Sequence, residues 1–325
     1  MGVLGNLRKV AFLKPFIAAR DSLMKRMGLF KVKSSVKRRF SYIKWRFEDS
    51  RKRREIAKHI SQLPDSLLYR EHTFSPTLTV SLTSYGKRVE NSSPYAIYSI
   101  LKQTVLPDRI VLNLDKKTWD GDNLPALLKK LERIGVTIQF VDDIGPHTKL
   151  LPTLSRYPDD VIITVDDDVY YEPDTIEELL NAYQQSDGKA VICRAGKCLI
   201  KDNGRFGLYS EQPDLSVYSD SPFKLPFGFA GVLYPPHIFS DEVFNVELIK
   251  RLCPKADDIW FGITELREGI RVDYLENSSW KENSVDRNEE FNPSVSNALY
   301  IKNDLDGQND VQWTALMDHY FGDGV

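Results

Sequence analysis

The sequence predicts an α/β protein with a mainly parallel central sheet flanked by helices. From about residue 77 onward, β-rich runs alternate with helical stretches of about ten residues, which is the pattern of βαβ units. The run Val161–Val165 is continuously apolar, as expected of a strand buried on both faces of a sheet. The chain has 325 residues, 42% hydrophobic and 28% charged, and can therefore hold one large domain and an appendage.

The expected elements alternate along a main domain over residues 76–275. Strands are expected over Leu78–Thr83, Arg109–Leu114, Val136–Val141, Val161–Val165 and Ala190–Arg194. Helices are expected over Pro94–Gln103, Leu124–Ile134 and Pro173–Gln185. Gly135 is the expected end of the second helix, because glycine tolerates the left-handed conformation that follows many helices. Ligands of such sheets bind beyond the carboxyl ends of the strands, so the chemistry is expected there.

Residues 1–75 are predicted to form a basic, amphipathic helical extension. Residues 1–60 hold 18 of the 44 basic residues of the chain but only 4 of its 46 acidic residues. Aromatic side chains such as Trp45 and Phe47 are interleaved with these charges, which suits the anionic surface of a membrane. A solvated helix that packs on the main domain is an alternative. Nucleic acid is not an expected partner, because no recognised nucleic-acid motif accompanies the charge.

The cysteines and the hydropathy of the chain bear on its compartment. Cys193, Cys198 and Cys253 have neither the even number nor the regular spacing of a disulfide framework, so they are expected to be buried in a protein of a reducing compartment. No run reaches the roughly 18 apolar residues that cross a bilayer. Together with the basic extension, these features predict a cytoplasmic protein held peripherally at the inner face of the membrane.

Three consecutive carboxylates follow the apolar run Val161–Val165. Asp166, Asp167 and Asp168 repel one another at the end of a buried strand, so they need a cation or contact with water. Alternate residues of an extended segment point the same way, which places Asp166 and Asp168 on one face. Oxygen ligands suit Mn²⁺ or Mg²⁺, with diphosphate oxygens completing the shell. The alternative is an acidic loop that caps the following helix.

These motifs resemble those of GT-A glycosyltransferases, most closely the family-2-like bacterial enzymes of capsule, lipopolysaccharide and other surface-glycan assembly. The stretch Val161–Tyr171 resembles their DxD region, and Leu78–Arg88 resembles their opening strand and nucleotide-contacting loop. The stretches Ser99–Thr104 and Asp142–Leu150 also match, in the same order along the chain. The resemblance covers about residues 77–275 and implies a GT-A fold with a nucleotide-sugar as co-substrate.

The resemblance also implies roles for particular residues. The nucleotide pocket is expected to include Thr83, Ser84, Tyr85, Arg88, Asp142, Asp143, Lys149, Asp166 and Asp167. Within this set the arginine and the lysine offer cations to the diphosphate, and the hydroxyls and the aromatic ring suit a base and a ribose. Asp166 and Asp168 are the expected metal ligands. Asp115 is a further candidate near the base, and His147 is expected to be a loop residue rather than a ligand.

Transfer to a hydroxyl also needs a general base. The stretch Lys255–Gly262 resembles the acidic motif that supplies the base in inverting GT-A enzymes, which implies Asp258 as the base and Asp257 as the second candidate. The alternative is that Asp257 caps the helix that follows. The glycine-containing segment Phe227–Pro235 looks like the acceptor-side segment before the base, or is simply a bend.

The last part, residues 276–325, is predicted to be a polar loop followed by a helix over Asp310–Phe321. Residues 276–309 are either a mobile lid over the donor or a linker. His319 is the one histidine after His237, but it lacks the His-x-His partner of many GT-A metal sites, so a third protein ligand of the metal is not assigned.

The predicted function is therefore an inverting glycosyltransferase that uses a metal ion and a nucleotide-sugar, with a UDP-sugar as the preferred donor. The acceptor is a hydroxyl of a glycan or of a lipid-linked saccharide. Two alternatives remain: a sugar nucleotidyltransferase, and an inactive membrane-associated scaffold with the same fold. A nucleotidyltransferase normally has a glycine-rich phosphate loop after its first strand, whereas Ser84–Arg88 contains one glycine.

Overall fold

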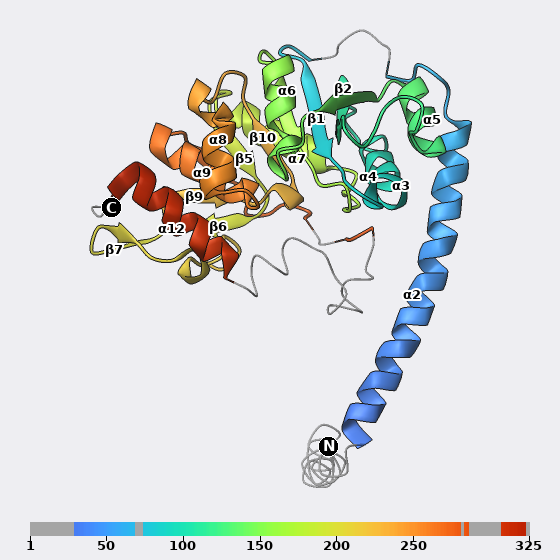
Figure 1. Cartoon of the computed structure of the whole chain (residues 1–325), viewed down its shortest axis with the longest axis horizontal. Coiled ribbons are helices and arrows are strands. Elements are labelled where there is room, and N and C mark those ends of the chain that lie inside the picture. Colours follow the sequence, from blue (N-terminus) through green and yellow to red (C-terminus); the bar gives the residue numbers. More distant parts are fainter. Residues whose placement is uncertain (1–28, 69–73, 281–282, 286–306, 323–325) are drawn as a thin grey trace, which may run out of the picture. The chain divides into compact units, whose positions relative to one another are not determined.

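The computed structural model describes residues 29–68, 74–280, 283–285 and 307–322 (Figure 1). The chain divides into two compact units, Met1–Glu55 and Ile56–Val325. The second unit contains the sheet and the candidate site. The three-part division at residues 75 and 275 that the sequence suggests stays a prediction.

Helix α2 (Leu29–Gln62) provides the described residues of the first unit. Ile43 and Phe47 are four residues apart on this helix, and their side chains are 63% and 69% exposed. Lys44 and Glu48 form an ion pair at the same spacing. The predicted basic extension is helical over residues 29–62, but the apolar residues of α2 do not gather on one face, so its predicted amphipathic character is not confirmed. Residues 1–28 lie outside the described residues. In the described part of the chain, no helix has the length and apolar character needed to span a bilayer.

Seven strands of the second unit form one mainly parallel sheet, in the order β11-β5-β10-β4-β1-β2-β3. Strand β10 is the exception, because it runs antiparallel to both of its neighbours, β4 and β5. The strands are β1 (Leu78–Thr83), β2 (Arg109–Asp115), β3 (Thr137–Val141), β4 (Val161–Thr164), β5 (Val191–Cys193), β10 (Val232–Tyr234) and β11 (Val272–Tyr274). The predicted α/β fold with a mainly parallel sheet flanked by helices is confirmed.

Helices surround this sheet, and two small sheets accompany it. Helices α3, α4 and α5 lie toward β2, whereas α8, α9 and α12 gather at the opposite end of the unit (Figure 1). The α-helices are α3 (Arg88–Asn91), α4 (Ser93–Ile100), α5 (Ala126–Ile134), α6 (Leu151–Arg156), α7 (Thr175–Gln185), α8 (Val246–Leu252), α9 (Asp257–Glu268) and α12 (Gln308–Phe321). The 3-10 helices are η1 (His147–Lys149), η2 (Tyr209–Glu211), η3 (Gly228–Ala230) and η4 (Asp241–Phe244). The small sheets pair β6 (Gly196–Cys198) with β9 (Lys224–Pro226), and β7 (Lys201–Asp202) with β8 (Arg205–Phe206).

The sheet separates two hydrophobic cores. Successive side chains of a strand point to opposite faces, so Ile163 lies in one core and its neighbour Ile162 in the other. Helices α4, α5 and α7 contribute to the first core, for example through Ile97, Leu128 and Leu179. Helices α6, α8, α9 and α12 contribute to the second, for example through Leu154, Leu248, Trp260 and Trp313. Burial on both faces explains why the strands of this sheet read as nearly continuous apolar runs.

Strand β1 carries buried polar side chains on one face. The Ser81 hydroxyl donates to the backbone carbonyl of Lys149 over 2.5 Å and lies 2.6 Å from the hydroxyl of Thr153. The Asn113 amide of β2 donates to the same Thr153 hydroxyl over 3.0 Å. Buried polar groups are costly unless they are hydrogen-bonded, so this network holds η1 and the start of α6 firmly against β1. The backbone of Lys149 is thereby fixed at the carboxyl end of the sheet.

The predicted bounds of the longer elements agree closely with the observed ones. Strand β1 has the predicted bounds, and Gly135 ends α5 with a positive φ of 115°. The strands β10 and β11 were not predicted. Strand β10 lies toward the end of Phe227–Pro235, the segment interpreted above as a bend or an acceptor-side segment.

The order of the strands creates a reversal point between β1 and β4. From β1 the chain continues outward to β2 and β3, and then returns to place β4 on the other side of β1. In open α/β sheets the crevice at such a point, beyond the carboxyl ends, is where ligands bind. Here Ser84 follows β1, and Asp166 follows the end of β4.

Candidate active site

A cavity of about 620 Å³ opens at this reversal point. Eleven of the twelve predicted site residues line it: Thr83, Ser84, Tyr85, Arg88, Asp143, Lys149, Asp166, Asp167, Asp168, Asp257 and Asp258. The exception is Asp142, whose carboxylate forms an ion pair of 2.7 Å with the exposed Lys116 outside the lining. Asp115 also lines the cavity. The fold therefore brings together segments that follow β1, β3 and β4 with the start of α9.

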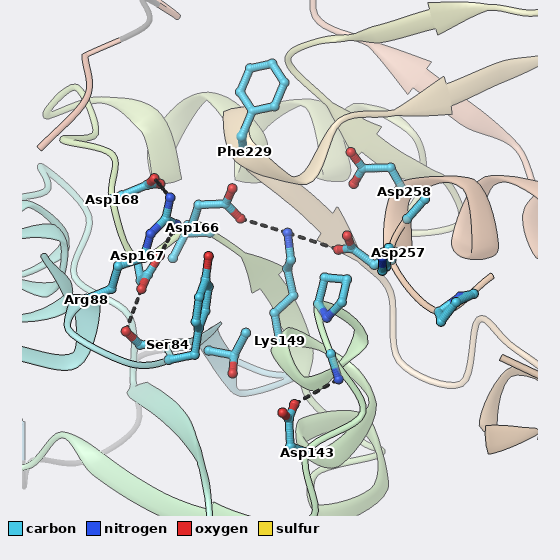
Figure 2. A pocket seen from close by; sticks show the side chains of 18 of the residues that line it. Ser84, Arg88, Asp143, Lys149, Asp166, Asp167, Asp168, Phe229, Asp257 and Asp258 are labelled. Atoms are coloured by element: carbon cyan, nitrogen blue, oxygen red, sulfur yellow. Dashed lines mark hydrogen bonds and ion pairs between the residues drawn. The ribbon is translucent and has the colours of Figure 1, made fainter. Parts of the chain in front are cut away.

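Asp167 is the buried member of the three consecutive carboxylates. It accepts hydrogen bonds from the Ser84 hydroxyl over 2.5 Å and from Arg88 Nη1 over 3.1 Å. Burial raises the pKa of Asp167, and the nearby Arg88 guanidinium opposes that rise. Arg88 Nη2 also pairs with Asp168 over 2.8 Å, so one guanidinium bridges two of the three carboxylates (Figure 2). Ser84 and Arg88, predicted for the nucleotide, thus also hold the acidic segment in place.

Lys149 connects the acidic segment to the predicted base motif. Its Nζ lies 2.7 Å from Asp166 Oδ1 and 3.0 Å from Asp257 Oδ2, and the side chain is only 9% exposed (Figure 2). Burial would lower the pKa of Lys149, but the carboxylates of Asp166, Asp257 and Asp258 outweigh burial and raise that pKa well above the ordinary lysine value. Lys149 is therefore a permanent cation among the carboxylates of the site.

Asp258 projects into the cavity from the first turn of α9. Its Oδ1 accepts a hydrogen bond of 2.9 Å from the backbone N–H of Gly228. Burial and the neighbouring Asp257 carboxylate raise the pKa of Asp258 to about 8, although Lys149 and the Gly228 N–H act in the opposite direction. A carboxylate with a pKa near neutrality is suited to accept a proton from a substrate.

Gly228 is the residue that permits this arrangement. A Cβ at this position would lie 2.7 Å from Lys149 Nζ and 3.0 Å from Asp258 Oδ1. At Gly228 the segment Phe227–Pro235 therefore approaches the lysine and the aspartate closely.

Asp257 is the first residue of α9 and not its cap. The N-cap position belongs to Ala256, and no side chain hydrogen-bonds the cap there. The alternative interpretation of Asp257 as a capping residue is therefore wrong. Its carboxylate forms an ion pair with Lys149, whereas the carboxylate of the adjacent Asp258 accepts a hydrogen bond from the Gly228 N–H.

Asp166 and Asp168, the predicted metal ligands, present two carboxylates to the cavity. The side chains of Asp166 and Asp168 are 29% and 24% exposed at the cavity, and their ion pairs with Lys149 and Arg88 each use one oxygen. Among the described residues, no group of three or more His, Cys, Asp and Glu side chains could hold a metal ion. Two carboxylates fit Mg²⁺ or Mn²⁺ when substrate phosphates and water supply the remaining ligands. The exposed His319 on α12 is not in the cavity lining.

Two aromatic side chains that the site prediction did not include, Phe227 and Phe229, also line the cavity. Phe227 stacks on Phe229 with ring centroids 5.4 Å apart, and Phe229 lies 5.5 Å from Trp280. In Figure 2 the ring of Phe229 points away from Lys149, above the carboxylates. Phe229 was visible in the sequence only as part of Phe227–Pro235, and Trp280 only as part of the polar segment 276–309.

The described residues of that polar segment are tied to the site. The Ser279 N–H donates to Glu178 of α7 over 2.8 Å, and the Val285 N–H donates to the backbone carbonyl of Asp168 over 2.6 Å. The Tyr170 N–H donates to the carbonyl of Asn283 over 2.8 Å. The remainder, residues 281–282 and 286–306, lies outside the described residues, so the choice between lid and linker stays a prediction.

One segment of the chain matches the model of a known protein family. Residues 80–232 match the model of a family described as "Glycosyl transferase family 2". The expected resemblance to this family is therefore confirmed for the part of the chain from β1 to β10. The capsule and lipopolysaccharide type stays a prediction. No curated protein matches the chain.

Several solved structures are similar at low identity. TarS of S. aureus in complex with UDP is 15% identical with a TM-score of 0.42, and the match covers 64% of this chain and 59% of that one. The mannosyltransferase PcManGT of Pyrobaculum calidifontis, in complex with GDP-Man and Mn²⁺, is 16% identical over 71% of this chain and 63% of that one, with a TM-score of 0.40. 4-Diphosphocytidyl-2C-methyl-D-erythritol synthase of Anaerococcus prevotii is 12% identical over 66% and 94%, with a TM-score of 0.43.

Proposed function

We propose that this protein is an inverting glycosyltransferase that transfers a sugar from a nucleotide-sugar, preferably a UDP-sugar, to a hydroxyl of a glycan or lipid-linked acceptor in surface-polysaccharide biosynthesis. The family match over residues 80–232 supports a glycosyltransferase. The observation that carries the proposal is that Lys149 joins Asp166, at the end of β4, to Asp257, next to Asp258, in a single cavity. This arrangement supports a donor site and a base that lie side by side.

The donor's nucleotide is proposed to occupy the side of the cavity formed by the segment after β1. Tyr85 is 47% exposed there, and the Arg88 guanidinium lies 5.4 Å from the centre of its ring. Such a ring can stack on a base, while the guanidinium is suited to phosphate. Asp143 also lines the cavity and accepts a hydrogen bond of 2.8 Å from the Gly145 N–H, and its carboxylate is proposed to bind the ribose.

Asp166 and Asp168 are the proposed ligands of Mn²⁺ or Mg²⁺. The metal would neutralise the negative charge of the departing nucleoside diphosphate. Lys149 adds a second, permanent cation beside Asp166. Its charge favours the same departure, because a preorganised cation in a partly buried site stabilises developing negative charge more than water does.

Asp258 is the proposed general base. As the bond between the donor C1 and the diphosphate breaks, the acceptor oxygen forms a new bond to C1, and its proton passes to the Asp258 carboxylate. The Gly228 N–H orients this carboxylate from the opposite side of the turn. Attack from the face opposite to the leaving group inverts the configuration at C1.

We expect nucleotide binding to raise the melting temperature of the purified protein by mass action. UDP, GDP, dTDP and CMP are each tested with Mn²⁺ and with EDTA. The expected result is a shift of a few degrees with UDP that requires Mn²⁺. Asp168→Ala should lose this shift, and Asp142→Ala, at the exposed pair with Lys116, should retain it.

The same preparation distinguishes the alternatives. Release of a nucleoside diphosphate from UDP-, GDP- or dTDP-sugars supports the transferase, whereas release or consumption of pyrophosphate would identify a nucleotidyltransferase. A well-folded protein that binds none of the nucleotides would instead be the inactive scaffold, and the proposal would be abandoned.

We also propose that the basic helix α2 holds the protein peripherally at the cytoplasmic face of a membrane. Exposed Ile43 and Phe47 lie among basic side chains, as in helices that bind anionic interfaces. The double variant Ile43→Ser/Phe47→Ser of the full chain should sediment with anionic vesicles about 10-fold less than the wild type. Neutral vesicles are the control. Equal sedimentation of both proteins would contradict a role for this face.

A further inference from the structure

Tyr171 places its hydroxyl group between two backbone segments of the cavity. The hydroxyl accepts a hydrogen bond of 2.7 Å from the Asp166 N–H and donates one of 2.9 Å to the carbonyl of Phe229. Because an N–H only donates and a carbonyl only accepts, the hydroxyl proton can point in one direction alone. Tyr171 is 5% exposed, so both hydrogen bonds of its hydroxyl are buried.

The bond to Phe229 extends this link to the proposed base. Phe229 lies in the turn η3, and the preceding residue, Gly228, donates its N–H to Asp258. A continuous path therefore runs from the backbone of Asp166, through the Tyr171 hydroxyl and one short turn, to the carboxylate of Asp258. Asp166 belongs to the donor side of the proposed reaction, and Asp258 belongs to the acceptor side.

The turn η3 has other supports, but they act at its ends. The Phe227 N–H donates to the carbonyl of Ala195 over 2.9 Å, and Arg194 reaches the carbonyl of Ala230 over 3.4 Å. Both partners belong to the segment after β5. The hydrogen bond of Tyr171 instead ties this turn to the segment of the three carboxylates.

We infer that Tyr171 is a positioning residue, whose hydroxyl fixes the turn η3 and thereby sets the separation between the donor-side Asp166 and the base Asp258. The inference rests on the proposed function. The turn packs tightly against Lys149, because a Cβ at Gly228 would lie 2.7 Å from Lys149 Nζ. A small displacement of the turn therefore changes the position of Asp258 relative to the donor.

Tyr171→Phe tests this role because it keeps the buried ring and removes only the hydroxyl. The Asp166 N–H and the Phe229 carbonyl then lose their partner, and the turn is free to shift. We expect kcat to fall about 10- to 100-fold, since a displacement of about 1 Å at a reacting group has an effect of this size. The KM for the donor and the affinity for UDP should change far less than kcat, because Asp166 keeps its ion pair with Lys149, and the side chains of Tyr85 and Arg88 are untouched.

The pH profile provides a readout that a merely structural role would not affect. Asp258 faces Asp257, Lys149, Asp166 and Glu265 as charged or titratable groups, and the Gly228 N–H favours its ionised form. A loosened turn weakens that N–H bond, so the acidic limb of the kcat/KM profile should move to higher pH in Tyr171→Phe.

The matched control is Tyr320→Phe, which removes a tyrosine hydroxyl that donates to Glu242 over 3.1 Å, outside the cavity lining. Its kcat should equal that of the wild type. A Tyr171→Phe enzyme with wild-type kcat and pH profile would overturn the inference, as would a loss of UDP affinity in proportion to kcat. A wild-type protein without turnover or nucleotide binding would instead count against the proposed function itself.

Discussion

Asp258→Asn should lower kcat by about 10³-fold while leaving UDP binding intact, since general-base catalysis typically contributes a factor of 10² to 10⁴. The amide is nearly isosteric with the carboxylate and can still accept the hydrogen bond from the Gly228 N–H. It cannot take a proton from the acceptor. Initial rates with the donor and acceptor of the wild type measure the loss, and thermal shifts with UDP measure the binding.

The pH dependence follows from the same residue. The base must be ionised, and the pKa of Asp258 is about 8, so kcat/KM of the wild type should rise with pH and level off above that value. The acidic limb should be absent in Asp258→Asn. If Asp257→Asn abolished turnover and Asp258→Asn did not, Asp257 would be the base.

A stability change of opposite sign should accompany the loss of activity. Folding raises the pKa of Asp258 from its ordinary value of 3.8 to about 8, so the folded state binds this proton more tightly than the unfolded state. The resulting stabilisation is complete below pH 3.8 and is lost as the pH rises through about 8. Asp258→Asn should therefore raise the melting temperature, and more at pH 8 than at pH 5. Asp142→Asn, at an exposed carboxylate, is the control and should not show this pattern.

The outline of the sheet was predictable from the sequence because its long strands are apolar runs that are buried on both faces. Strand β1 has the predicted bounds, and Gly135 adopts the left-handed conformation expected at the end of α5. The antiparallel strand β10 was not predicted, since it lies within the glycine-containing segment Phe227–Pro235, which was interpreted as a bend or an acceptor-side segment. Its pairing with β4 and β5 depends on contacts distant in the sequence.

The sequence allowed the residues of the site to be predicted, but not the contacts that these residues make with one another. Asp166 and Asp258 could be chosen because each lies in a short motif at the end of a predicted element. The motifs contain no information that Lys149 pairs with carboxylates from both, or that Gly228 must lack a side chain because the lysine and the base approach it. Asp142 and Asp143 were equivalent in the sequence. The structure separates them, because only Asp143 lines the cavity.

Lys149→Met should be the most destabilising single change in the site. The lysine is 9% exposed, and its two partners, Asp166 and Asp257, are 29% and 11% exposed. Methionine fills a similar volume but leaves these carboxylates without their shared cation. Removal of one partner from a buried ion pair costs about 3–5 kcal/mol, whereas an exposed pair contributes about 0–1 kcal/mol. Lys116→Met, which breaks the exposed pair with Asp142, is therefore the matched control.

The pH dependence of this destabilisation tests its electrostatic origin. Lys149 is one of the groups that lower the raised pKa of Asp258, so without the lysine the folded variant binds this proton still more tightly than the unfolded chain does. Its deficit in the free energy of unfolding, measured by urea denaturation, should be smaller at pH 5 than at pH 8. Asp257→Asn in the Lys149→Met background should recover part of the deficit, because one uncompensated charge is removed. A Lys149→Met protein as stable as Lys116→Met would show that the three side chains are hydrated rather than packed as a charged cluster. The link between the donor side and the base would then have to depend on the backbone turn alone.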